Sequence, residues 1–142
     1  MERYENDVIA WANEQAAFIR VGRFDMLDLE HLADEIEDVG KSELREFMSH
    51  LAGLIAHLLK WQYQEGFRSK SWQRTINYKR KELSYNLKKT PSLKSRITDM
   101  EWFDLVWEKA VSQTMNETGL DGFPDTCPWS FEQIMNPDFW PE

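Results

Sequence analysis

The 142-residue sequence predicts an all-α protein, a helical bundle formed by one domain over residues 1–142. Apolar residues recur at spacings of three and four along most of the chain, and no stretch alternates for long enough to predict a strand. Aromatic residues make up 13% of the chain and include seven tryptophans. These large apolar side chains are sufficient for a packed core, although the chain has a net charge of −8. We therefore expect about four main helices and an irregular C-terminal tail.

The first helix is expected over residues 3–21, with Gly22 as its C-terminal stop. The second is expected over residues 28–65, where Asp28 can cap the first turn. Its early apolar residues gather opposite an acidic outer face. The apolar residues are Leu29, Leu32, Ile36 and Val39, and the acids are Glu30, Asp34, Glu37 and Asp38.

The apolar pattern of the second helix slips near Gly40, because Val39 and Leu44 are five residues apart. This slip predicts either one kinked helix or two helices separated by a short break. Beyond it, apolar residues from Leu44 to Trp61 cover about half of the helix circumference, an arc that marks the most buried helix of the domain.

The third and fourth helices are expected over residues 70–89 and 91–118, separated by Pro91 and ended by Gly119. On the fourth helix, Trp102 and Val106 fall outside the expected inner face, so we expect them to cover the tail or to face a second copy. That inner face consists of Leu93, Ile97, Met100, Phe103, Trp107, Val111 and Met115. The proline-containing tail is expected to hold one short helix near residues 130–135 and to pack its aromatic side chains on the bundle.

The charges are sorted along the sequence. Residues 68–96 hold ten of the seventeen basic residues and one acid, Glu82, so this segment carries +9 and the rest of the chain −17. No amino-terminal signal peptide and no apolar stretch of about 20 residues is present, which predicts a cytoplasmic protein without a membrane partner. The single cysteine, Cys127, fits a reducing compartment and is expected to pack in the tail, because no base lies near it in sequence.

Several strings together carry a family resemblance: RFDMLDLEHLADEIEDVGKSE, HLLKWQYQ, RSKSWQRTI, TPSL, ETGL, FPDTCPW and DFWPE. In this order and spacing, over residues 4–142, the chain resembles the bacterial family catalogued as domain of unknown function 29. The resemblance implies a helical protein. It implies no activity, and it assigns no catalytic residue.

The basic third helix is a candidate surface for binding a macromolecule. Four cations form one of its faces and two tyrosines flank them, which would combine phosphate contacts with stacking platforms. These residues are Lys70, Arg74, Tyr78, Lys81, Tyr85 and Lys88. The alternative is an ordinary solvated face whose charge is partly balanced by the acids of residues 28–38.

A metal site is a second candidate. Glu46, His50 and His57 share the polar stripe of the central helix, and Asp104 is a further potential ligand. The spacing does not favour it, because two histidines seven residues apart are about 10 Å apart along a helix. His31 and Glu35, one turn apart, are expected to meet water.

From these patterns we expect a cytoplasmic, non-enzymatic helical module without a cofactor, which binds another protein or a second copy of itself through its sorted charges. A nucleic-acid-binding protein using residues 70–89 is one alternative. A metal-binding helical-bundle enzyme is the other.

Overall fold

The computed structural model describes residues 3–142 and consists of helices joined by turns and loops, which confirms the predicted all-α class. No strand occurs among the described residues, and none of their helices is long and apolar enough to cross a membrane. The chain forms two compact units, unit 1 (Met1–Glu43) and unit 2 (Leu44–Glu142). The single domain expected from the sequence stays a prediction.

Unit 1 contains α1 (Val8–Arg20), a 3₁₀ turn at Phe24–Met26, and the first part of α2. Residues 4–6 form a turn, so α1 starts later than predicted. Asp7 caps α1, because its side chain accepts a hydrogen bond from the backbone N–H of Ala10 at 3.0 Å. Trp11 and Gln15 are the buried residues of this helix.

The apolar residues that the sequence placed on an inner face of α2 are mostly exposed. Leu29, Ile36 and Val39 expose 65–71% of their surface, and only Leu32 is partly covered. The acids on the other side of the helix are exposed as predicted. This part of α2 therefore contributes little to a core within unit 1.

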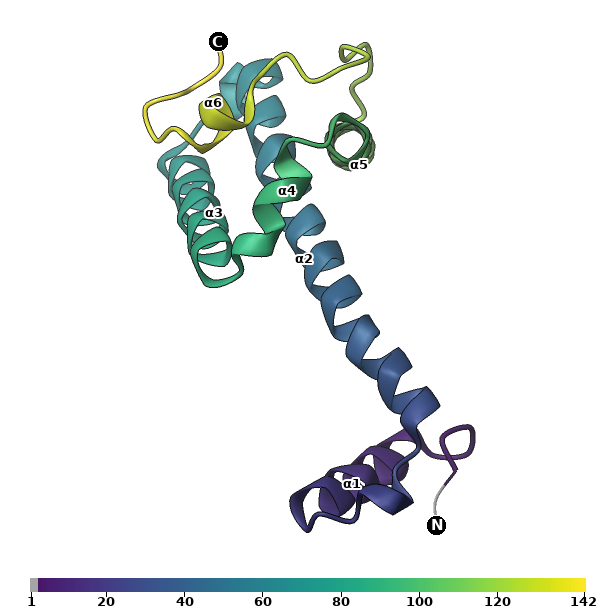
Figure 1. The fold of residues 1–142 in the computed structure, drawn as a ribbon. Coiled ribbons are helices and arrows are strands. Elements are labelled where there is room, and N and C mark those ends of the chain that lie inside the picture. Colours follow the sequence, from purple (N-terminus) through teal and green to yellow (C-terminus); the bar gives the residue numbers. More distant parts are fainter. Residues whose placement is uncertain (1–2) are drawn as a thin grey trace. The chain divides into compact units, whose positions relative to one another are not determined.

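The helix α2 runs without interruption from Leu29 to Tyr63, through Gly40, as Figure 1 shows. The predicted alternative of a break near Gly40 is therefore wrong. The apolar slip has another physical cause, because the boundary between the two units lies at residues 43 and 44. Before this boundary the apolar residues of α2 are mostly exposed, and after it they form the core of unit 2, while the backbone of the helix continues.

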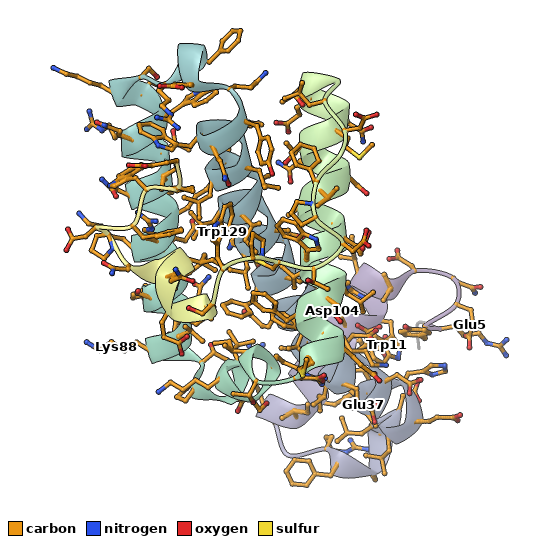
Figure 2. The ribbon with its side chains drawn as sticks, turned by 90° about the horizontal axis from the view of Figure 1, so that it is seen from above. Glu5, Trp11, Glu37, Lys88, Asp104 and Trp129 are labelled. Atoms are coloured by element: carbon orange, nitrogen blue, oxygen red, sulfur yellow. The ribbon has the colours of Figure 1, made fainter. Side chains whose placement is uncertain are left out.

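Unit 2 is built around the C-terminal half of α2, where the side chains of Phe47, Leu51, Leu54, Ile55, Leu58 and Leu59 have almost no exposed surface. The helices α3 (Lys70–Lys89) and α5 (Met100–Thr118) lie on either side of this segment (Figures 1 and 2). The bounds of α3 are those predicted, and Ser69 caps its first turn by accepting from the N–H of Trp72 at 3.1 Å.

The region expected to be one helix at 91–118 is divided. Pro91–Leu93 forms a 3₁₀ turn, α4 covers Lys94–Ile97, and α5 begins at Met100. Asp99 starts α5, because its carboxylate accepts hydrogen bonds from the N–H groups of Glu101 and Trp102, at 3.1 and 3.3 Å.

Trp107, Phe103 and Val111 of the predicted inner face pack in the core, but the buried face of α5 is rotated toward Trp102 and Val106. Trp102 is 8% exposed and Val106 is fully buried, whereas Met100 is 79% and Met115 41% exposed. The predicted outer position of Trp102 and Val106 is therefore wrong. The apolar phase of residues 91–97 does not continue beyond the interruption at residues 98 and 99.

The C-terminal tail contains α6 (Phe131–Met135), which confirms the short helix predicted near residues 130–135. A capping box holds its start: Ser130 and Gln133 each accept a hydrogen bond from the backbone N–H of the other. The tail packs against the core through Trp129, whose ring meets that of Trp107 edge to face with centroids 6.4 Å apart.

We predict that Gly40→Ala stabilises the protein by up to about 1 kcal/mol, because alanine is the better helix former and nothing lies within 4 Å of the added Cβ. Chemical unfolding followed by circular dichroism measures the change. Gly119→Ala is the matched control with the opposite sign, since Gly119 ends α5 at a φ of 75°, where a Cβ is strained. A loss of stability in Gly40→Ala would contradict a continuous α2.

Candidate interaction surface on α3

The six residues proposed from the sequence lie along one face of α3 and are all exposed. At 100° per residue they fall within an arc of about 80° and extend over roughly 27 Å of helix. We call this set the α3 surface: Lys70, Arg74, Tyr78, Lys81, Tyr85 and Lys88. Tyr78 and Tyr85 expose 63% and 62% of their surface, and Figure 2 labels Lys88 near the end of the helix.

A groove of about 520 Å³ runs along the N-terminal part of this surface. It brings together Lys70, Arg74, Tyr78 and Lys81, with Gln73 and Asn77 completing its lining. Tyr85 and Lys88 lie outside the groove. Within unit 2 none of the four cations of the α3 surface forms an ion pair, so their charges are available to a partner.

Two other basic residues of the segment 68–96 are held by backbone carbonyls instead of facing solvent. Arg68 donates from Nε to the carbonyl of Trp61 at 2.7 Å and lies 5.1 Å from the Trp61 ring centre. Arg80 is 3% exposed and donates to the carbonyls of Ile134 and Phe139, at 2.8 and 2.7 Å. From the sequence both were predicted to be surface charges, because the residues next to an arginine in the sequence do not show which backbone carbonyl groups it contacts.

The four metal candidates are not brought together. Glu46 and Asp104 are exposed, and Figure 2 places Asp104 on α5. His50 lies with Nδ1 3.5 Å from a carboxylate oxygen of Glu82. His57 donates from Nδ1 to the carbonyl of Gly53 at 2.9 Å. Among residues 3–142 no group of three or more His, Cys, Asp or Glu side chains has a geometry that holds a metal ion.

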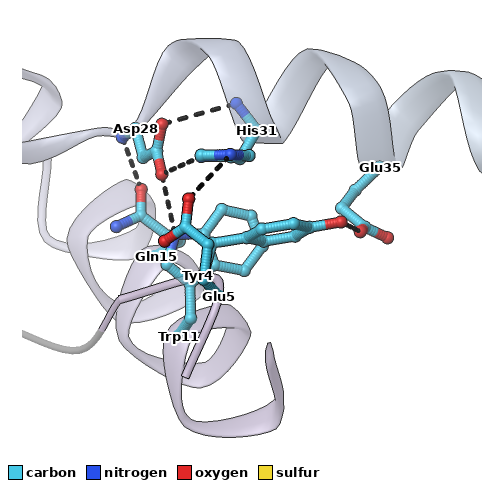
Figure 3. Close-up of polar contacts among 7 residues, drawn as sticks. All are labelled: Tyr4, Glu5, Trp11, Gln15, Asp28, His31 and Glu35. Carbon is cyan, nitrogen blue, oxygen red and sulfur yellow. Dashed lines mark hydrogen bonds and ion pairs between the residues drawn. The ribbon is translucent and has the colours of Figure 1, made fainter. Parts of the chain in front are cut away.

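Unit 1 contains a polar and aromatic cluster that was not predicted from the sequence (Figure 3). Asp28 is its centre: its Oδ2 accepts from the Trp11 indole N–H at 3.1 Å and lies 2.7 Å from Nδ1 of His31. The backbone N–H of Asp28 donates to Gln15 at 2.8 Å. Asp28 therefore both begins α2 and fastens it to α1.

His31 does not simply meet water, as the sequence had suggested. Its ring stacks on that of Tyr4 with centroids 4.2 Å apart, and its Nε2 lies 3.5 Å from Glu5. Glu35 does not pair with His31 but accepts a hydrogen bond from the Tyr4 hydroxyl. That bond raises the pKa of Tyr4 to about 12, because ionised Tyr4 would lose the bond and face a negative charge.

The pKa of His31 is raised, chiefly by its hydrogen bond to Asp28, and the same bond lowers the pKa of Asp28. In unit 2 the pKa of His57 is lowered, because burial disfavours the charged ring. Burial also raises the pKa of the Cys127 thiol to about 11, so at neutral pH this group is protonated and a poor nucleophile. Cys127 lies partly buried against the core, where the sequence had placed it.

Comparison with known proteins bears on these features. The family model described as "Domain of unknown function DUF29" matches residues 3–140. The chain belongs to this family. Its fold is similar to the crystal structure of an alpha-helical protein of unknown function from Rhodospirillum rubrum, with a TM-score of 0.58 and 26% identity over 98% of this chain and 92% of the other. No curated protein matches the chain.

We predict that His31 and His57 of this DUF29 protein titrate on opposite sides of the ordinary histidine value of 6.5. Protonated His31 stabilises unit 1 fully below pH 6.5, and that contribution is lost as the pH rises through the raised pKa. Two-dimensional NMR of the ring signals measures both values. Asp28→Asn should lower the pKa of His31 and leave His57 unchanged, and an unchanged His31 would contradict the pairing.

Proposed function

We propose that this protein is an interaction module that binds an acidic protein surface through the α3 surface. The observation that supports the proposal is the exposure of four unpaired cations and two tyrosines on one helix face, beside a groove of about 520 Å³. Tyrosine and arginine are enriched at the centres of protein interfaces, where they combine apolar contact with hydrogen bonds.

The charge distribution favours a second copy of the chain as the partner. Residues 1–43 contain four bases and twelve acids, a net charge of −8, whereas residues 44–142 contain thirteen of each. Unit 1 therefore carries the whole net charge of the protein, and unit 2 supplies the cations of the α3 surface. Such complementarity steers association and fixes its register more than it adds affinity.

The spacing of the charges also matches. The exposed acids Glu30, Asp34, Glu37 and Asp38 form a stripe on α2, which we call the acidic α2 surface. Glu30 and Asp34 are one helical turn apart, as are Lys70 and Arg74 on α3. In the proposed homodimer the acidic α2 surface of each copy meets the α3 surface of the other.

We predict that reversing three cations of the α3 surface (Arg74→Glu, Lys81→Glu and Lys88→Glu) weakens self-association by about 10- to 100-fold, since exposed ion pairs contribute about 0–1 kcal/mol each. Sedimentation equilibrium at low and high salt measures this effect, and salt should weaken the wild-type dimer. The matched control reverses Arg45, Lys94 and Arg96, which are exposed outside the α3 surface.

A compensating exchange tests the pairing directly. The triple reversal on the acidic α2 surface (Glu30→Lys, Asp34→Lys and Glu37→Lys) should also weaken self-association, and mixing it with the α3 variant should restore a heterodimer. The proposed homodimer would be contradicted if the wild-type protein stays monomeric at low salt, or if its molar mass in sedimentation equilibrium does not depend on salt.

Single-stranded nucleic acid is the second candidate partner, because Tyr78 and Tyr85 are exposed among the cations and offer stacking faces. We predict for this case that labelled single-stranded RNA binds at low salt and that Tyr78→Ala weakens binding by about 1–3 kcal/mol. Fluorescence anisotropy measures it. No binding at low salt, or binding unaffected by reversal of Arg74, Lys81 and Lys88, removes this candidate.

A further inference from the structure

A second cleft in unit 2 lies between α3 and the tail, next to the groove of the α3 surface. It measures about 400 Å³. Its lining consists of Asn77, Arg80, Lys81 and Ser84 from α3, and Met135 and Pro137 from the tail. The cleft thus combines polar and cationic side chains on one wall with apolar side chains on the other.

Arg80 is the unusual member of this lining, because it is a buried cation without a counter-ion. Its side chain is held by the carbonyls of Ile134 and Phe139 and lies 5.2 Å from the ring centre of Trp140. No acid of unit 2 forms an ion pair with it. Its Nη1 is buried and has no hydrogen-bond partner. Burying an unpaired charge and leaving N–H donors unsatisfied both cost free energy.

Asn77 precedes Arg80 by one helical turn and carries a second unsatisfied atom. Its Oδ1 is buried without a partner, and the residue lines the same cleft. The amide oxygen and nitrogen of an asparagine exchange places when the side-chain amide turns by about 180°. After that turn, Asn77 and Arg80, one helical turn apart on the same wall of the cleft, would both carry unsatisfied N–H donors.

We propose that this cleft binds a carboxylate, with Arg80 and Asn77 as donors and Met135 and Pro137 against the apolar body of the ligand. A carboxylate brings one negative charge, which matches the single buried guanidinium, whereas a phosphate monoester brings about 1.5 to 2. The exposed Lys81 and Ser84 lie toward solvent, where they contact the remaining part of the ligand.

The carboxylate has two sources, a small organic acid or an acidic side chain of a protein partner. The cleft shares Asn77 and Lys81 with the groove of the α3 surface, so an acidic chain that lies in the groove reaches the cleft directly. The site for a small acid stands independently of the proposed homodimer, because its donors belong to α3 alone.

An NMR titration of isotopically labelled full-length protein tests the proposal, with the Nε–H signal of Arg80 as the probe. Sodium butyrate represents a small organic acid, a capped peptide of glutamates represents an acidic protein segment, and sodium phosphate and sodium chloride at matched ionic strength are the comparisons. We expect butyrate to shift the Arg80 signal saturably in the millimolar range, at least tenfold more tightly than phosphate. A peptide that shifts the signal while butyrate does not identifies a protein carboxylate as the source.

Ser84→Phe fills the cleft from an exposed position and should abolish the butyrate shift without disturbing the hydrogen bonds of Arg80. Ser71→Phe, also exposed on α3 but outside the cleft, is the matched control. The double reversal of Arg74 and Lys88 should weaken self-association and leave the butyrate shift, so the two proposals fail separately. An Arg80 signal unmoved by butyrate and peptide, or moved equally by phosphate, overturns the carboxylate site.

Discussion

The burial of the C-terminal half of α2 is the constraint on which unit 2 depends. Apolar side chains point outward from most of this segment, and a single helix has no means of covering them itself. The helices α3 and α5 cover two sides, and the aromatic tail covers what remains. Each fully buried side chain such as Phe47 or Leu51 contributes about 1.5–3 kcal/mol, so the tail is a structural part of the unit and not an appendage.

Two arginines supply the hydrogen bonds that the tail needs in this arrangement. A tail rich in proline makes few backbone hydrogen bonds of its own, and its carbonyls need donors from elsewhere. Arg80 supplies them at Ile134 and Phe139, and Arg68 lies 3.4 Å from the carbonyl oxygen of Pro141. The basic segment 68–96 therefore has two tasks, since Arg68 and Arg80 fasten the tail while the exposed cations remain on the α3 surface.

Elements with strong local signals were predictable from the sequence. The helix α3 was expected at its observed bounds, because apolar residues recur on one face of residues 70–89, and the short α6 was expected near its observed bounds. The interruption at residues 98 and 99 was missed, since Asp99 acts as a cap only when the chain turns there. The six residues of the α3 surface were found because exposure on a helix follows from periodicity.

The contacts that the sequence did not reveal are long-range ones. Nothing in the local pattern shows that Arg80 meets residues 54 and 59 positions away, or that His31 stacks on Tyr4. The continuity of α2 through Gly40 was also undecided, because a slip in apolar phase arises equally from a broken helix and from a change of neighbours. Only the tertiary arrangement distinguishes these two causes.

The unbroken α2 has one more consequence, which concerns local opening. All of its buried residues lie between Phe47 and Trp61, and none lies in the part that belongs to unit 1. Hydrogen bonds that bury no side chains around them open at a small fraction of the global unfolding free energy. The helix is therefore continuous in its backbone but unfolds in two parts. Its backbone amides from Glu37 to Glu43, which lie beyond the contacts of Asp28, His31 and Glu35, exchange with solvent through local opening, while those near Leu54 and Ile55 exchange only when unit 2 unfolds.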